Sequence, residues 1–453
     1  MAGRQSGASG GVTDRALNAK LLERKFWGRG SITTARHRTY GASAKMGGWI
    51  TLFGCYRAPA HFDAVQIVLV SPVNHDPANP IKATVMAPAR FNDGVNGLDA
   101  AGAIITPTPV TWGTTNPRNP RNPGGGAPNT IITGASGAAP NEIEARVISD
   151  IIPLSSLNRT DVAGGLPLLM VRVQGADPPG MSTPGLSGVA VGNASLRAVE
   201  PDHWCQYANN TDLASATAGV VKTTDDAFAR WAPSIEIIYY LRGSRVVTIG
   251  CMGDSLDGGW GNVGTANGTA GLMDGWCRKF ARQLSALYPV SFVAYQRDGF
   301  TGTRFQEEAM NALLDGGVGL THLFINPSST NNNWAANPAS LTADLRRTGH
   351  LIDQCVALGI TPILRYHWAG QDIGSAAGIR IREYVDAHKA SGGLTFDARK
   401  VVSFDGTDTH VSINQAWITR RADNSAVDFQ HLNNGGHQAV ANAAFAQRGR
   451  FNL

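Results

Sequence analysis

The sequence predicts two kinds of structure in one chain, an all-β N-terminal half followed by an α/β C-terminal half. Its 453 residues exceed the roughly 250–300 at which a single hydrophobic core stops growing. Its 53 glycines and 23 prolines indicate many turns. Near residue 244 the hydrophobic pattern changes from short alternating runs to buried runs that alternate with helical periodicity.

The segment 46–240 has the pattern of an antiparallel β-sandwich. Short runs rich in β-branched residues, such as WITLFGCY, AVQIVLVS and LPLLMVRVQ, are separated by turns rich in glycine, proline and asparagine. Regularly spaced short strands with turn signals are typical of a sandwich, and we expect a jelly-roll-like accessory domain. Residues 1–45 are expected to form an N-terminal arm, with a short helical pattern over 13–26.

Residues 244–453 are predicted to form a parallel sheet covered by helices on both faces. Strands are expected at RVVTIGCMG, VSFVAYQ, THLFIN, ITPILRYH and KVVSFD. Helices are expected at DGWCRKFARQLSAL (Trp276, Phe280, Leu284 and Leu287 at helical spacing), FQEEAMNALLD, ASLTADLRRTGHLIDQCVAL, AAGIRIREYVDAHKAS and GGHQAVANAAFAQ. This alternation is typical of a parallel α/β sheet. Right-handed crossovers bring the carboxyl ends of its strands to one edge, where ligands bind.

Composition argues against several classes of function. The net charge is only +5 and no nucleic-acid-binding motif is present, so we expect no nucleic-acid partner. The five cysteines include no CxxC pair, which argues against a zinc site and favours buried free thiols, with a Cys55–Cys205 disulfide as the alternative. We expect no metal and no cofactor. No run approaches the ~18 apolar residues of a membrane span, so no membrane partner is expected.

The N-terminal sequence bears on the compartment. Its first 30 residues are polar and contain no apolar core of a signal peptide. This fits a cytoplasmic protein, one secreted by another route, or one whose signal has been removed. The compartment and the oligomeric state are therefore left open.

Ser255 is the first candidate for chemistry. In RVVTIGCMGDSLDGGWGN a buried run ends in Gly-Asp-Ser, which places Ser255 just past the first strand of the parallel sheet. Gly253 and Gly258 permit a tight loop between this strand and the next helix. Serine is also common in turns and helix caps, so the tetrapeptide alone leaves a nucleophile and a turn residue as alternatives.

A base and its orienting acid are predicted near the end of the chain. A serine nucleophile needs a base, and the base needs a group that orients it. Asp428 and His431 lie three residues apart in a loop before the last predicted helix. Ser255, His431 and Asp428 are therefore candidate catalytic residues, and the alternative is that Asp428 caps the helix and His431 is a solvated surface residue. His437 is an alternative base, but it falls within the helix pattern and is expected to be structural.

Acyl transfer also needs donors that bind an oxyanion. Gly302, in QRDGFTGTRF, lies where the next helix begins and backbone amides lack helical partners. The loop after the third strand, NPSSTNNNW, offers the side-chain amides of Asn331, Asn332 and Asn333. Asparagine-rich loops also form ordinary turns, so the sequence leaves the choice among the three open.

These blocks resemble the SGNH, or GDSL, hydrolases, a family of serine esterases, over roughly residues 244–450. The GDSL block implies Ser255 as the nucleophile. The RDGFTG block implies Gly302 as the oxyanion amide, with Arg297 where the family usually has Asn. The DFQHLNNGG block is the most specific match and implies Asp428 and His431 as the acid and the base.

The third block is the weakest match. In SSTNN the family's Gly is missing, and Asn332 stands where the family has Asp. The alignment implies Asn331 as the oxyanion donor, with Asn333 as the next choice.

The resemblance implies a three-layer α/β/α, flavodoxin-like domain that hydrolyses esters without a metal. Similar two-domain bacterial esterases have an N-terminal β-sandwich, and many act on acetylated carbohydrate. We therefore expect a short-acyl ester of a small molecule or glycan as the substrate. Trp260 and Trp334 are expected to line the cleft, and His367 and Trp368 are further candidates. The rival hypotheses are a non-catalytic glycan-binding or structural protein with this fold, and an acyltransferase with the same triad.

Overall fold

The computed structural model describes part of the chain in detail. These residues are 28–31, 48–70, 82–87, 90–92, 96–98, 107–111, 146–157, 166, 168–177, 203–209, 234–241, 246–259, 275–296, 301–314, 319–418 and 430–453. Most of the predicted N-terminal arm, including the helical pattern over 13–26, lies outside them.

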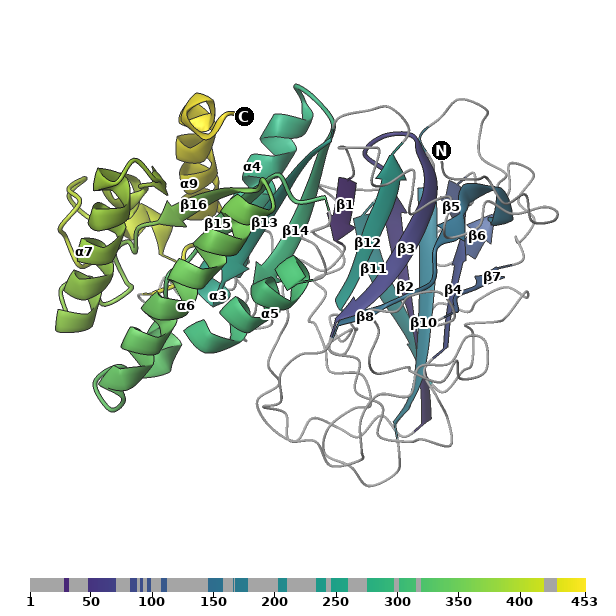
Figure 1. Ribbon diagram of the computed structural model, residues 1–453, viewed down its shortest axis with the longest axis horizontal. Helices are drawn as coiled ribbons and strands as arrows, with labels where there is room; N and C mark the ends of the chain where they lie inside the picture. The colour runs from purple at the N-terminus through teal and green to yellow at the C-terminus, as the bar shows by residue number, and fades with distance from the viewer. Residues whose placement is uncertain are drawn as a thin grey trace, which may run out of the picture.

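The described residues of the N-terminal half form antiparallel sheets (Figure 1). One sheet has the order β1-β12-β3-β8, with β9 also paired to β3, and another has the order β11-β2-β10-β4-β7. Strands β5 and β6 pair with each other. The strands are β1 (Gly28–Ser31), β2 (Gly48–Arg57), β3 (Phe62–Val70), β4 (Lys82–Met86), β5 (Arg90–Asn92), β6 (Asn96–Leu98), β7 (Thr108–Pro109), β8 (Arg146–Ile148), β9 (Ile152–Pro153), β10 (Leu168–Asp177), β11 (His203–Asn209) and β12 (Ser234–Leu241), with a short 3-10 helix, η1 (Leu154–Ser156), after β9. Antiparallel β-structure is confirmed here, and its jelly-roll form stays a prediction.

The C-terminal half contains the predicted parallel sheet. Its order is β14-β13-β15-β16-β17, and every neighbouring pair runs parallel. The strands are β13 (Val247–Gly253), β14 (Val290–Gln296), β15 (His322–Ile325), β16 (Thr361–Arg365) and β17 (Leu394–Phe396). The second and third strands flank the first on either side. The order in which the chain adds strands to the sheet therefore reverses at β13. Parallel sheets bind ligands at the carboxyl ends of the strands beside such a switch point.

Helices cover both faces of this sheet. Ile249 and Cys251 of β13 pack with residues of α4 and α9, whereas Met252 packs with residues of α5, α6 and α7. Side chains alternate across a strand, so the two clusters lie on opposite faces. The helices are α3 (Ser255–Gly258), α4 (Trp276–Ser285), α5 (Gly302–Leu314), α6 (Pro338–Ala357), α7 (Ala376–Ala390), α8 (Arg399–Val402) and α9 (Asn434–Ala446), with 3-10 turns η2 (Thr330–Asn332), η3 (Gln415–Trp417) and η4 (Arg448–Phe451). Among the helices described, none combines the length and hydropathy needed to cross a bilayer.

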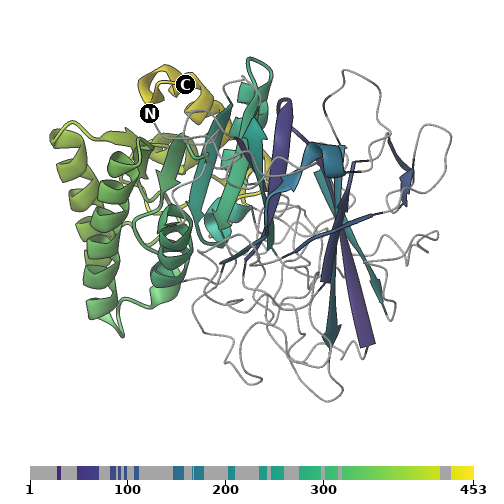
Figure 2. The ribbon, with the colours of Figure 1, turned by 45° about the vertical axis from the view of Figure 1, so that its right-hand side comes forward.

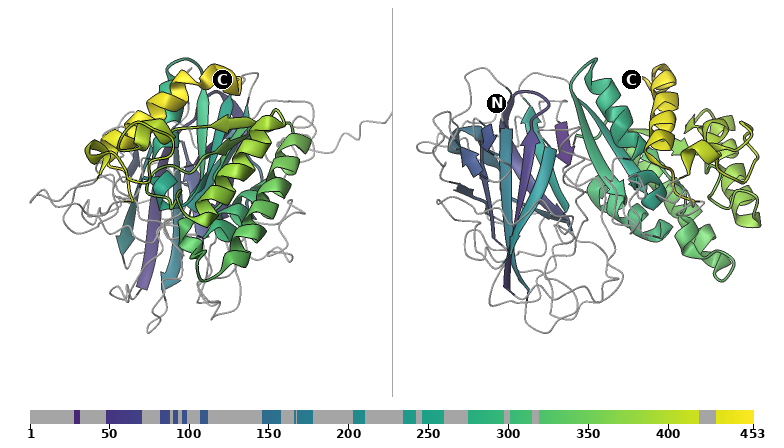
Figure 3. Two further views of the ribbon diagram at one scale, coloured as in Figure 1. Left: turned by 90° about the vertical axis from the view of Figure 1, so that its left-hand side faces the viewer. Right: turned by 180° about the vertical axis from the view of Figure 1, so that it is seen from behind.

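The two kinds of sheet lie side by side (Figures 1 and 3). Strand β1 runs close to β14, the outermost strand of the parallel sheet. Helices α6 and α7 lie on the side of the molecule away from the antiparallel strands (Figure 2). The antiparallel half therefore borders the parallel sheet along its β14 edge.

Two local predictions in the C-terminal half are wrong. KVVSFD is not a strand: it contains α8, and the fifth strand is β17, Leu394–Phe396. The Asp397 carboxylate accepts a hydrogen bond from the Arg399 backbone N–H at 3.0 Å, which favours a helical turn at this point. Leu287 does not extend the buried face of α4, because the helix ends at Ser285 and Leu287 is 55% exposed.

The cysteines with described side chains are free thiols. Cys251, Cys277 and Cys355 are all buried and form no disulfide. In the register of β11 on β2, Cys55 faces Trp204 and Cys205 faces Gly54. Cys55 and Cys205 are therefore not direct cross-strand partners.

A buried ion pair joins the carboxyl ends of three strands. Asp257, in the turn after β13, and Arg365, at the end of β16, are 2.8 Å apart (Oδ2 to Nη2), with side chains 0% and 1% exposed. The same carboxylate accepts hydrogen bonds from Trp276 Nε1 and from Asn326 Nδ2, which follows β15, both at 3.0 Å. The Arg365 guanidinium lies 4.0 Å from the ring centroid of Trp368. One carboxylate thus holds β13, β15, β16 and α4 together.

This ion pair also explains the glycine of GDSL. A Cβ atom on Gly253 would overlap the Asp257 carboxylate, and one on Gly275 would overlap the Asp257 backbone carbonyl. Both positions therefore need glycine for close approach, and any larger residue would displace Asp257.

We predict that Arg365→Met lowers the free energy of unfolding by about 3–5 kcal/mol, because it leaves the Asp257 carboxylate buried without its cation. Urea denaturation at neutral pH measures the change. The control is Arg380→Met on an exposed part of α7, for which we expect a change of about 0.5 kcal/mol or less. Equal losses in the two variants would contradict the prediction.

Candidate active site

Ser255 begins α3 just after β13, the strand between β14 and β15. Asp254 is the N-cap of this single turn, and its Oδ1 accepts a hydrogen bond from the Leu256 backbone N–H at 3.0 Å. Gly259 ends the turn with a φ of 88°, a left-handed conformation that glycine adopts without strain. The turn presents Ser255 at the carboxyl end of β13, where the order of the strands reverses.

The structure brings His431 to Ser255. Ser255 Oγ and His431 Nε2 are 2.9 Å apart, although the residues are separated by 176 positions in the sequence. The His431 loop is held in place by Asn433, the N-cap of α9, which accepts from the Gly436 N–H at 2.9 Å. Asn433 Nδ2 also donates to the Ile418 carbonyl at 3.2 Å. His431 Nε2 is therefore in position to accept the Ser255 proton.

Two predicted site residues lie outside the described part of the chain. Asp428, the expected orienting acid, precedes the described segment 430–453, and Trp260 follows the segment 246–259. Their roles stay predictions. His437, the alternative base, is fully buried within α9.

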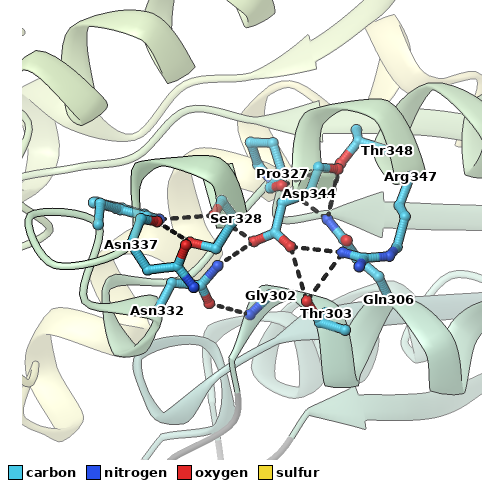
Figure 4. A network of polar contacts seen from close by, with 12 residues as sticks. Gly302, Thr303, Gln306, Pro327, Ser328, Asn332, Asn337, Asp344, Arg347 and Thr348 are labelled. Carbon is cyan, nitrogen blue, oxygen red and sulfur yellow. Dashed lines mark hydrogen bonds and ion pairs between the residues drawn. The ribbon is translucent and has the colours of Figure 1, made fainter. Parts of the chain in front are cut away.

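Gly302 is the first residue of α5, at the carboxyl end of β14. Its backbone N–H donates to Asn332 Oδ1 at 2.7 Å (Figure 4). A Cβ atom at this position would overlap the Asp344 carboxylate, so the site requires glycine. In this structure the predicted oxyanion amide is thus engaged in a hydrogen bond within the protein.

The three consecutive asparagines after β15 have different environments. Asn332 is buried, and its Nδ2 donates to Asp344 Oδ2 at 2.6 Å. Asn333 has a φ of 50° and ends η2 in a left-handed conformation. Asn331 is exposed on the same turn. Only the tertiary structure separates them, because the partner of Asn332 lies on α6.

A second buried carboxylate, Asp254, ties the asparagine loop to the nucleophile turn. Ser329 Oγ donates to Asp254 Oδ2 at 2.6 Å and accepts from the Asn331 backbone N–H at 3.1 Å. Burial, and after it the negative charge of Asp257, raises the pKa of Asp254 from its ordinary 3.8 to about 6. Sequence reasoning did not identify Ser329, because no motif marks it as a partner of GDSL.

Of the residues expected at the cleft, the described ones, Trp334, His367 and Trp368, are buried. Trp334 is 7% exposed, its Nε1 donates to Ser328 Oγ at 3.2 Å, and its ring stacks on His367 with centroids 6.0 Å apart. Trp368 is fully buried against Arg365. Burial and the Arg365 charge lower the pKa of His367 to about 3, so this ring is neutral. Trp334, His367 and Trp368 thus pack in the interior, and a role of Trp334 in binding substrate stays a prediction.

Among the described residues, no group of three or more His, Cys, Asp and Glu side chains is arranged to hold a metal ion. The described polar contacts at this edge of the sheet instead join hydroxyl, amide, indole and guanidinium groups to buried carboxylates.

Comparison with known proteins gives structural likeness only. No protein-family model matches the sequence, and no curated protein does. Similar solved structures include a family 3 carbohydrate esterase from Clostridium thermocellum, with 15% identity and a TM-score of 0.34, covering 46% of this chain and 98% of that chain. An esterase from Pseudoalteromonas has 14% identity and a TM-score of 0.33, with 45% and 98% covered. A G-D-S-L lipolytic family member from Veillonella parvula has 16% identity and a TM-score of 0.32, with 45% and 99% covered.

We predict that Asp254→Asn changes the pH dependence of stability. Because the pKa of Asp254 is about 6 when folded and 3.8 ordinarily, the folded state holds an extra proton between these values. The wild type therefore loses stability from this group as pH rises from about 4 through 6. In urea denaturation, the free energy of unfolding of the variant should rise relative to that of the wild type by on the order of 2 kcal/mol between about pH 4 and pH 7. Parallel pH curves would contradict this.

Proposed function

We propose that the protein is a serine esterase that hydrolyses carboxylic esters through an acyl-enzyme on Ser255. The observation that carries the proposal is the 2.9 Å contact between Ser255 Oγ and His431 Nε2. It lies at the carboxyl end of β13, the switch point of the strand order, where parallel sheets bind ligands. The resemblance of the GDSL and DFQHLNNGG blocks to those of the SGNH hydrolases supports the same assignment.

In the proposed reaction His431 acts first as a base and then as an acid. Ser255 Oγ attacks the ester carbonyl carbon while His431 Nε2 takes its proton. The tetrahedral intermediate collapses, His431 returns the proton to the leaving alcohol, and the acyl group stays on Ser255. Water then attacks the acyl-enzyme while His431 accepts a proton from it, and His431 returns this proton to Ser255 Oγ as the carboxylic acid is released. Asp428 is proposed to orient His431 through Nδ1.

The oxyanion is proposed to bind the Ser255 and Gly302 amides and the Asn331 side chain. Asn331 is favoured over Asn332 because the Asn332 amide group already donates to Asp344. The Gly302 N–H donates to Asn332 Oδ1 in this structure. Its role therefore requires that the substrate oxygen share this N–H in a three-centre bond or displace the Asn332 oxygen.

The substrate proposed is a short-acyl ester, in particular an acetyl ester of a carbohydrate. The sequence resemblance supports it, as does the finding that antiparallel sheets precede the parallel one. We propose that 46–240 is a jelly-roll-like accessory domain and that 244–453 is a three-layer, flavodoxin-like hydrolase domain. The 2-1-3-4-5 strand order of the parallel sheet supports the second part.

We predict that Ser255→Ala lowers kcat for p-nitrophenyl acetate by at least about 1,000-fold, because no nucleophile remains. The assay measures p-nitrophenol release with acyl chains from acetyl to octanoyl, and a steep preference for acetyl is expected. Ser340→Ala is the matched control, since Ser340 Oγ only donates to the Asn337 carbonyl on the exposed start of α6. Activity that survives in Ser255→Ala would reject the mechanism.

We predict that Asn331→Ala lowers kcat by about 100- to 1,000-fold with little change in KM, because it removes a donor used only in the transition state. Steady-state kinetics with the acetyl ester measure both constants. Asn333→Gly is the control, because glycine keeps the left-handed backbone of this position. A larger loss of kcat in the control than in Asn331→Ala would show that Asn331 is not the oxyanion donor.

A further inference from the structure

Asp344 is a buried carboxylate on α6 that contacts both the start of α5 and the loop after β15. Its side chain is 0% exposed. It accepts hydrogen bonds from Ser328 Oγ at 2.7 Å, Asn332 Nδ2 at 2.6 Å and Thr303 Oγ1 at 3.2 Å. It also pairs with Arg347 Nη1 at 3.0 Å (Figure 4). A carboxylate only accepts hydrogen bonds, so it suits a position where four donors converge.

The donors that bind Asp344 adjoin both proposed oxyanion groups. Ser328 and Asn332 lie on either side of Asn331 in the loop after β15, and Thr303 directly follows Gly302. One carboxylate on α6 therefore holds the start of α5 and the loop after β15, where Gly302 and Asn332 are 30 residues apart in the sequence.

A continuous chain of contacts links Gly302 to this carboxylate. The Gly302 N–H donates to Asn332 Oδ1, and Asn332 Nδ2 donates to Asp344 Oδ2. The Gly302 Cα packs so closely on Asp344 that a Cβ would overlap Oδ2. The position of the Gly302 amide thus depends on Asp344 through both a hydrogen bond and direct packing.

We propose that Asp344 is a positioning residue that sets the spacing between the Gly302 amide and the Asn331 side chain. The proposal rests on the proposed esterase function. Asp344 contacts no reacting atom and acts through Asn332, Ser328 and Thr303. Oxyanion donors must be held about 2.7–3.1 Å from the developing charge. A small shift of either segment therefore weakens binding of the transition state more than binding of the substrate.

The polarity of the Asn332–Asp344 contact provides a sharp test. Asp344→Asn places one amide group against another, and Asn332→Asp places two carboxylates at 2.6 Å. The double variant Asn332→Asp/Asp344→Asn restores one donor and one acceptor with the direction reversed. Such a pair isolates the coupling between the two side chains.

Steady-state kinetics with p-nitrophenyl acetate, together with urea denaturation, compare the wild type with these variants. We expect each single variant to lower kcat by about tenfold or more while KM changes by less than about threefold. The double variant should recover at least about fivefold over the product of the two single losses. Asp386→Asn is the matched control. It removes a carboxylate on α7 that accepts a hydrogen bond from the Tyr366 hydroxyl, and it should leave kcat unchanged.

A second variant covers the case in which Asp344→Asn does not fold. Thr303→Val keeps the Asp344 carboxylate and removes one of its hydrogen-bond donors, because valine is similar in size to threonine but has no hydroxyl. We expect a smaller loss of kcat with KM retained. An unchanged kcat in folded Asp344→Asn or, if that variant does not fold, in Thr303→Val would overturn the positioning role, and so would an absence of rescue in the double variant. A raised kcat would also overturn it, because Asn332 would then be withholding the Gly302 amide.

The same measurements separate this proposal from the proposed function. A wild type without Ser255-dependent hydrolysis would reject the esterase assignment, and with it the role of Asp344. An active wild type whose kcat is insensitive to Asp344→Asn would reject the positioning role alone.

Discussion

The ion pair between Asp257 and Arg365 is the interaction on which the site depends most. Burying two charges is unfavourable unless good geometry and further hydrogen bonds compensate. Here Trp276 and Asn326 donate to the carboxylate, and the guanidinium lies over Trp368. Asp257 is two residues beyond Ser255, so the pair joins the turn that carries Ser255 to the neighbouring strands.

Two more buried carboxylates extend the same principle along the edge of the sheet. Asp254 accepts from Ser329, and Asp344 accepts from Ser328 and Asn332. Each joins the loop after β15 to a different element, the nucleophile turn in one case and α6 in the other. Acceptors fixed in the interior thus orient loops that carry exposed residues such as Asn331. Groups held in this way need little reorganisation during a reaction.

The carboxyl ends of the strands therefore form a preorganised framework in which packing and chemistry are separate tasks. Large aromatic side chains belong to the packing: Trp334 and Trp368 are buried beside the loops, and their rings contact His367 and Arg365. The polar groups nearest Ser255 are those to which we assign the proposed chemistry. The division explains why an aromatic residue beside a motif in the sequence need not contact a substrate.

The sequence by itself determined the alternation of strands and helices after residue 244 and marked Ser255 and His431 as a pair, because periodicity and short motifs report local burial and local turns. It did not separate β17 from α8, where Asp397 favours a helical turn. Only the tertiary structure distinguished Asn331 from Asn332, buried Trp334, and brought Asp344 to Gly302. Those outcomes depend on side chains of distant segments meeting at one edge of the sheet, and no local pattern encodes such a meeting.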